Sequence, residues 1–224
     1  MDMNIVSSSQ PGMEIQVSLF DAVIDLLLVK PIFLLGIVLI VILLAVIFRR
    51  HSNIPKAKTV ILSMALYYYL YVMLTHIVGI PKLSEFKRLS KLGENFFNPN
   101  INLIPFSDGL NLGFVLNIFL FIPLGFLCPL ISRAFEQGKK TFWIGFGFSL
   151  FIEIVQLFTL YRATDINDLI TNVVGTMIGY FCFRLIAKFG IVKQYSPQEF
   201  TEKDDTAYIP FAAMIVAFAL GFFS

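Results

Sequence analysis

Two apolar segments of the chain, residues 141–160 and 166–187, each carry one line of polar or small residues. The first line consists of Gly145, Ser149, Glu153 and Gln156. The second line consists of Asp165, just before its segment, and of Asp168, Asn172, Gly175 and Gly179 within it. At about 100° per residue, each line occupies one face of an α-helix. Carboxyl and amide groups gathered in this way can exchange protons, hold a cation or hydrogen-bond a polar ligand.

A helical hairpin would bring these two faces together. Only a few residues separate the segments, so they should pack as antiparallel helices with their polar faces inward. Glu153 lies about 10 Å before the end of its segment, at 1.5 Å per residue, and Asn172 lies at a similar depth. Asn117, in the window 111–132, reaches the same level. The side chains expected above this level are Gln156, Arg162, Asp165 and Asp168. We therefore predict a polar pit that opens at one membrane surface.

Several functions and one purely structural role fit such a pit. An ionised Glu153 in hydrocarbon costs about 3 kcal/mol on insertion scales, so it should be protonated, paired with Arg162 or hydrated. In an enzyme, Glu153 or Asp165 would act as a general acid or base. A Ser149–His76 pair is a weaker nucleophilic alternative. A polar network that only fixes helix packing is the structural alternative.

The carboxylates also raise the question of a metal. Glu153, Asp165 and Asp168 carry the oxygen ligands that Mg²⁺ and Ca²⁺ prefer. Arg162 beside them favours a salt-bridge network instead, so we expect no metal and no cofactor. We assign no catalytic residue. The candidate ligand-binding residues are Asn102, Asn117, Glu153, Gln156, Arg162, Asp165, Asp168 and Asn172.

The composition indicates that these segments are membrane helices. Hydrophobic residues make up 57% of the 224 residues and charged residues 14%, whereas about a quarter of a soluble domain is charged. A bilayer span takes about 20 apolar residues. The windows that approach this length are 31–48, 59–80, 111–132, 141–160, 166–187 and 208–223. The predicted fold is an all-α polytopic transmembrane helical bundle of about six spans.

The stretch before the first window differs from the predicted spans. Glu14, Asp21 and Asp25 interrupt the apolar stretch 13–29, which suits an N-terminal interfacial helix. We therefore divide the chain into a tail with this helix, residues 1–30, and a transmembrane domain, residues 31–224.

Gly175-x-x-x-Gly179 is expected to be a close-packing position and not a ligand contact.

The Lys and Arg residues predict the orientation. The connections after the first, third and fifth windows hold 11 of the 17 basic residues. Because cytoplasmic connections are enriched in Lys and Arg, we place these connections inside and both termini outside the cell membrane. The polar pit would then face the cell exterior.

The longest connection, residues 81–110, has an amphipathic start. Its apolar residues recur every third position, as Leu83, Phe86, Leu89 and Leu92. Its basic residues are Lys82, Lys87, Arg88 and Lys91. A short interfacial helix would bury the first set and present the second to phosphate-bearing lipid headgroups. A solvated basic face without a ligand is the alternative.

The order of motifs in residues 98–185 resembles the VanZ-like membrane protein family. The shared motifs begin with Asn102-Leu103-Ile104-Pro105-Phe106 and with Asn117-x-x-Leu120-Phe121-x-Pro123-Leu124-Gly125-Phe126. They continue with Ser149-x-x-x-Glu153-x-x-Gln156 and with Arg162-x-x-Asp165-Ile166-x-Asp168-Leu169-Ile170-x-Asn172-x-x-Gly175-x-x-x-Gly179. The resemblance implies an association with low-level resistance to teicoplanin-type glycopeptide antibiotics, without a settled biochemical activity. This chain has Asn167 where the family often has a further acid, which again weakens the metal interpretation.

These observations favour an envelope protein that binds a lipid-linked or amphipathic ligand in the outward-facing pit. The expected partners are membrane lipids, and the candidate ligands are lipid-linked cell-wall intermediates or lipoglycopeptides. An intramembrane enzyme that modifies a cell-wall lipid intermediate and a transporter or flippase are the alternatives. The transporter is disfavoured because the polar residues stop in the outer half, whereas transporter sites lie near the midplane. The net charge of +2 gives no reason to expect a nucleic-acid partner.

Overall fold

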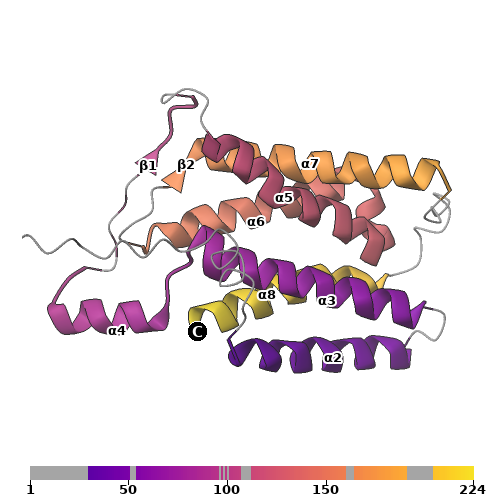
Figure 1. The fold of residues 1–224 in the computed structure, drawn as a ribbon, viewed down its shortest axis with the longest axis horizontal. Coiled ribbons are helices and arrows are strands. Elements are labelled where there is room, and N and C mark those ends of the chain that lie inside the picture. Colours follow the sequence, from indigo (N-terminus) through magenta and orange to yellow (C-terminus); the bar gives the residue numbers. More distant parts are fainter. Residues whose placement is uncertain are drawn as a thin grey trace, which may run out of the picture.

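A computed structural model describes residues 30–50, 54–95, 97, 99, 101–106, 112–159, 164–190 and 204–224. Its long helices run side by side (Figure 1). They are α2 (Ile32–Arg50), α3 (Lys56–Val72), α5 (Leu112–Ile131), α6 (Gly138–Gln156), α7 (Ile166–Lys188) and α8 (Tyr208–Phe222). Each of the six predicted windows overlaps one of these helices, and the window 59–80 extends beyond the end of α3. The predicted interfacial helix at 13–29 lies outside the described residues.

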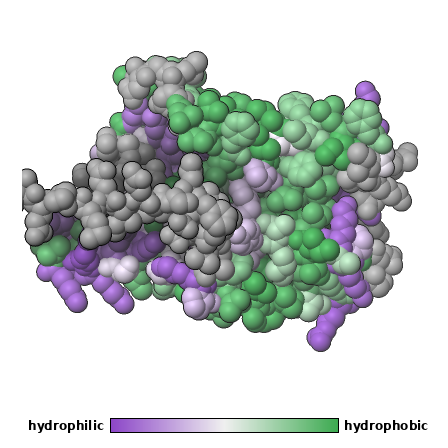
Figure 2. Space-filling model, viewed as in Figure 1, coloured by the Kyte–Doolittle hydropathy of each residue, from purple (hydrophilic) through white to green (hydrophobic). Residues whose placement is uncertain are grey.

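Most of the long helices have the composition of membrane spans. Within the described residues, five helical segments are long and apolar enough to cross a bilayer, and they contain α2, α3, α5, α7 and α8. α6 has 19 residues, which include Lys139, Lys140 and Glu153. Hydrophobic residues cover most of the visible flank of the helices, and hydrophilic residues gather near their two ends (Figure 2).

The long helices form two groups of three. In the first group α7 packs against both α5 and α6. In the second group α2, α3 and α8 pack against one another. Aromatic rings fill this second interface, where Phe33 of α2 stacks on Tyr67 of α3 with ring centroids 4.8 Å apart. We call the two sets the α5–α6–α7 group and the α2–α3–α8 group.

Glycines set the distance between α5 and α7. A Cβ atom added to Gly125 of α5 would lie 1.8 Å from the carbonyl oxygen of Thr176 in α7. A Cβ added to Gly175 or Gly179 of α7 would lie 2.2 Å or 2.1 Å from a carbonyl oxygen of α5. Small residues let helix backbones approach in this way. The prediction that Gly175 and Gly179 are close-packing positions is confirmed.

A tyrosine hydroxyl joins the two groups beside a proline. Pro123 lies inside α5 and has no N–H to donate to the preceding turn. The Tyr69 hydroxyl of α3 donates to the carbonyl oxygen of Leu120 in that turn, at 2.6 Å. This bond supplies a donor from a neighbouring helix to the backbone near the interruption.

We expect Tyr69→Phe to lower the free energy of unfolding by about 1 kcal/mol, because one intramolecular hydrogen bond is lost. Unfolding of the purified protein in mixed detergent–SDS micelles measures this change. Tyr208→Phe is the matched control, since Tyr208 is exposed. Equal stability losses in the two variants would contradict the role given to the Tyr69 hydroxyl.

The irregular elements gather at one end of the bundle. α3 continues into the π-helical segment η1 (Met73–Val78), and α4 (Leu83–Leu92) follows. The strands β1 (Ile101–Asn102) and β2 (Thr164–Asp165) form a parallel pair, with Asn102 opposite Asp165. These elements lie together at the left of Figure 1. We call this the α4 end of the molecule. The sequence predicted α4 but neither the π-helical segment nor the strand pair.

Candidate functional site

The polar faces of α6 and α7 meet through two hydrogen bonds. The Asn172 Nδ2 of α7 donates to Ser149 Oγ of α6 at 3.0 Å. One turn nearer the α4 end, Glu153 Oε2 accepts from the backbone N–H of Asp165 at 3.0 Å. Ser149, Glu153 and Asn172 are all buried. The contact that the helical spacing predicted between these two faces is therefore present.

The polar face of α7 also serves a second neighbour. Asn117 Nδ2 of α5 donates to Asp168 Oδ1 at 2.7 Å, and Gly175 and Gly179 contact the α5 backbone. The single face drawn from the sequence is therefore divided, with Asn172 directed to α6 and Asp168 directed to α5. α7 lies between the two helices and holds a polar contact to each.

Asp165 is the residue on which β1, α6 and α7 converge. Its Oδ1 caps the start of α7 by accepting from the N–H of Asn167 at 2.8 Å. Its Oδ2 lies 3.5 Å from the Asn102 Nδ2 of β1. Its own N–H is held by Glu153. Short polar side chains are preferred at helix N-termini because they satisfy free backbone donors.

Asn167 lies beside the candidate site but is not among the candidates predicted from the sequence. It is buried, and its Oδ1 accepts from the backbone N–H of Phe106 at 2.9 Å. Phe106 has a φ of 60°, a left-handed conformation that costs a non-glycine residue energy. The bond from Asn167 holds the segment after β1 in this conformation. Its position two residues after Asp165, the cap of α7, is the sequence feature that could have identified Asn167.

Gln156 points away from the other candidates, toward the α2–α3–α8 group. Its Nε2 donates to the carbonyl oxygen of Val78, at the end of η1, at 3.3 Å. Its side chain is buried, and its Oε1 has no hydrogen-bond partner among the described residues. Gln156 therefore links the two helix groups at the α4 end. Arg162, the predicted counter-charge of Glu153, lies outside the described residues.

The seven described candidates fall into a buried layer and a half-buried layer. Glu153, Gln156 and Asn172 are each 5% exposed or less. Asn102, Asn117, Asp165 and Asp168 are half-buried. We call these seven residues together the polar network. The buried layer can position other groups, and the half-buried layer can contact a ligand.

Two alternatives from the sequence have little support in this geometry. Ser149 is fully buried and bonded to Asn172, whereas His76 is exposed, so they do not form a nucleophilic pair. Within the described ranges, no group of three His, Cys, Asp or Glu side chains is placed to hold a metal ion.

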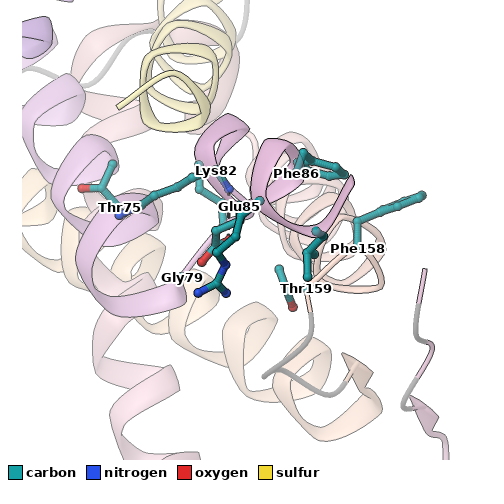
Figure 3. Close-up of a pocket in the computed structure, with 10 residues that line it drawn as sticks. Thr75, Gly79, Lys82, Glu85, Phe86, Phe158 and Thr159 are labelled. Atoms are coloured by element: carbon teal, nitrogen blue, oxygen red, sulfur yellow. Dashed lines mark hydrogen bonds between the residues drawn. The ribbon is translucent and has the colours of Figure 1, made fainter. Parts of the chain in front are cut away.

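A cavity of about 200 Å³ lies next to the polar network, between α4 and the ends of η1 and α6. Figure 3 shows its lining side chains. They are Thr75, Gly79, Ile80, Lys82, Glu85, Phe86, Arg88, Leu89, Phe158 and Thr159. The Thr159 hydroxyl donates to the Gln156 carbonyl oxygen at 2.7 Å, which connects the cavity to the network. We call this space the α4 cavity.

Comparison with known proteins gives the family of the chain. The family model described as VanZ/LLP1 matches residues 33–187. The chain is 33% identical over 95 residues to a protein named Protein VanZ from Enterococcus faecium. That match covers 42% of this chain and 58% of the relative, so the similar region spans little more than half of that protein. No solved structure matches. The chain belongs to the VanZ/LLP1 family and is a multi-pass membrane protein.

Proposed function

We propose that α6 is a sixth span and that the α4 end faces the cell exterior, with both termini extracytoplasmic. The Lys and Arg distribution supports this orientation. Arg49 and Arg50 end α2, and Lys139 and Lys140 begin α6, all at the end opposite α4. Cytoplasmic membrane borders are enriched in such residues. Lys139 and Lys140 lie in the first turn of α6, where they can reach the membrane interface.

We propose that the protein binds a lipid-linked or amphipathic ligand at the α4 end, at the outer leaflet of the cell membrane. The polar network carries this proposal, because it concentrates three carboxyl groups at one end of an otherwise apolar bundle. Ionisable groups in membrane helices are costly and mark functional sites by default. The half-buried Asp165 and Asp168 can accept hydrogen bonds from hydroxyl or amino groups of a ligand. Lipid-linked cell-wall intermediates and lipoglycopeptides both carry such groups.

The proposed cellular effect is reduced susceptibility to teicoplanin-type antibiotics. Those antibiotics bind cell-wall precursors outside the membrane, on the side where the α4 end is proposed to lie. Occupation of the site by a precursor or by the antibiotic would change the access of one to the other.

Glu153→Gln tests this function most directly. The amide oxygen can still accept from the Asp165 N–H, so the fold is expected to persist while the acid is lost. We expect cells that produce the variant to become as susceptible to teicoplanin as cells without the protein. Glu94→Gln is the matched control, because Glu94 is exposed just after α4. The protein abundance in the membrane is measured for each strain.

Two results would decide against the site. Unchanged teicoplanin susceptibility in both Glu153→Gln and Asp168→Asn, at equal membrane abundance, would remove the polar network from the account. Loss of folded protein in both variants would instead support a purely structural network.

An intramembrane enzyme is the second candidate function. It is favoured by the contact of a buried carboxyl, Glu153, with the backbone of a half-buried one, Asp165. Such pairs in unlike environments can divide acid and base roles. Incubation of the purified protein with a lipid-linked cell-wall intermediate tests it, and chemically unchanged lipid after long incubation would leave binding as the function.

A further inference from the structure

We propose that the α4 cavity is the subsite that binds the phosphate group of the amphipathic ligand. This inference rests on the proposed function and specifies the ligand class, a phosphate-bearing lipid with hydroxyl groups on its head. The supporting observations are the charges that line the cavity, its two buried threonines, its apolar residues and its volume.

The lining of the cavity carries one positive charge in excess. Lys82 and Arg88 supply two positive charges, and Glu85 supplies one negative charge. Glu85 is already engaged, since its Oε2 accepts from the backbone N–H of Lys82 at the start of α4, at 3.3 Å. A carboxylate at a helix N-terminus is also stabilised by the helix dipole. The lining therefore keeps a net positive charge that can attract an anion.

Lys82 and Arg88 suit a phosphate in complementary ways. A guanidinium binds phosphate oxygens through two parallel hydrogen bonds, and an ammonium acts as a compact point charge. Arg88 is exposed and Lys82 is half-buried, so an anion can approach from outside and still be enclosed on the Lys82 side. Figure 3 shows Lys82, just before α4, and Glu85 and Phe86 of α4 around the cavity that Thr159 also lines.

Two threonines in the lining offer acceptors for the hydroxyl groups of the same ligand. Thr75 Oγ1 donates to the carbonyl oxygen of Tyr71 at 2.7 Å, and Thr159 Oγ1 donates to that of Gln156 at 2.7 Å. Both threonines are buried. Because their hydroxyl protons are used within the protein, their oxygens are left as acceptors. Such atoms fit hydroxyl donors of a glycerol or sugar unit.

The walls and the size limit what the cavity can hold. Ile80, Phe86, Leu89 and Phe158 contribute apolar surface. The volume of about 200 Å³ is below the roughly 300–1,000 Å³ of sites that enclose a drug-sized molecule. The cavity therefore fits a headgroup, while an acyl or prenyl chain would stay in the surrounding lipid.

Only half of the four basic residues in and just before α4 line this space. Lys87 and Lys91 are exposed and do not line the cavity. They lie on α4 with Arg88, and they carry the same charge as Lys82 and Arg88. A ligand attracted by the general positive potential of α4 would respond to all four residues alike, whereas a ligand in the cavity would depend on two of them.

The test measures lipid binding by the full chain, purified in a neutral maltoside detergent. The probes are 1-oleoyl lysophosphatidic acid, 1-oleoylglycerol, which has the same chain without the phosphate, and inorganic phosphate. We expect the lysophosphatidic acid to bind more tightly than 1-oleoylglycerol. Lys82→Gln and Arg88→Gln should each weaken its binding by about tenfold, the effect of losing a hydrogen bond to a charged group.

The control variants are Lys87→Gln and Lys91→Gln, which should change the affinity by less than about twofold because exposed charges are screened by salt. Thermal unfolding is compared for all four variants to confirm equal folding. Equal weakening in all four variants would overturn the cavity as the subsite. Displacement of the lipid by inorganic phosphate at similar concentrations would overturn its assignment to a lipid headgroup.

The same measurements separate this inference from the proposed function. Equal binding of lysophosphatidic acid and 1-oleoylglycerol would overturn the phosphate subsite and leave a site for an amphipathic ligand. Binding of neither lipid would count against both proposals.

Discussion

Gly125→Ala is expected to prevent stable packing of α5 on α7. The added Cβ would lie 1.8 Å from the carbonyl oxygen of Thr176, a backbone atom that cannot rotate away. Overpacking by one methyl group costs about 1–3 kcal/mol when side chains can adjust. Here the helices must separate, so we expect a larger loss, seen as little folded protein in detergent extracts. Size-exclusion chromatography, detected by the fluorescence of Trp143, measures the folded fraction.

Gly147→Ala provides the matched control. Gly147 lies in α6, and a Cβ added there would meet no atom within 4 Å. Because alanine favours helix over glycine by about 0.5–1 kcal/mol, this variant should be as stable as the natural protein or more so. Similar folded fractions for Gly125→Ala and Gly147→Ala would show that α5 and α7 do not approach as closely as the structure places them.

Tyr67→Ala is expected to destabilise the α2–α3–α8 group by about 3 kcal/mol, in the range for removal of a fully buried aromatic side chain. The Tyr67 ring is fully buried, stacks on Phe33, and donates its hydroxyl to the Phe33 carbonyl oxygen at 3.1 Å. Because the removed ring is fully buried, the variant loses its packing contacts and one hydrogen bond. Tyr67→Phe removes the hydroxyl alone and should cost about 1 kcal/mol. The midpoint of unfolding in mixed detergent–SDS micelles measures both.

A second change at Gly36 makes this prediction sharper. A Cβ added to Gly36 of α2 would lie 1.9 Å from the Tyr67 hydroxyl oxygen and 2.3 Å from the ring carbon that carries it. Gly36→Ala should therefore destabilise the natural protein but cost much less in the Tyr67→Ala background. Residues in contact show such non-additive effects. Additive losses in the double variant would contradict the contact between Gly36 and Tyr67.

The sequence predicted the helices well because hydropathy and helical periodicity are local properties. The window 166–187 corresponds to α7, which spans Ile166–Lys188. The π-helical turn at Met73–Val78 has no such local cause, and it ends at Gly79 with a φ of 71°. The strand pair could not be predicted from two-residue segments that lie more than 60 positions apart. Pairing of this kind depends on how the helices place the connections.

The candidate site was predicted in part for the same reason. The spacing of Ser149, Glu153 and Asn172 identified the face shared by α6 and α7. A helical wheel considers one neighbour at a time, however, and α7 has two, so the contact of Asp168 with α5 was not foreseen. The α4 cavity is formed by residues 75–89 together with Phe158 and Thr159, which are distant from them in sequence. From the sequence, only the basic residues of the amphipathic segment at 82–92 indicated a site for phosphate-bearing headgroups in this region.

The order of the two helix groups along the chain has a consequence for biosynthesis. α5, α6 and α7 are consecutive, whereas α8 completes a group that α2 and α3 begin. Domains fold as their residues leave the ribosome, from the N-terminus onward. The α5–α6–α7 group can therefore assemble while translation continues, whereas α2 and α3 can complete their packing only after α8 is made. A ribosome that stops before Asp205 would release a chain with a complete α5–α6–α7 group. Its α2–α3–α8 group would lack α8, and membrane proteases could recognise such a chain.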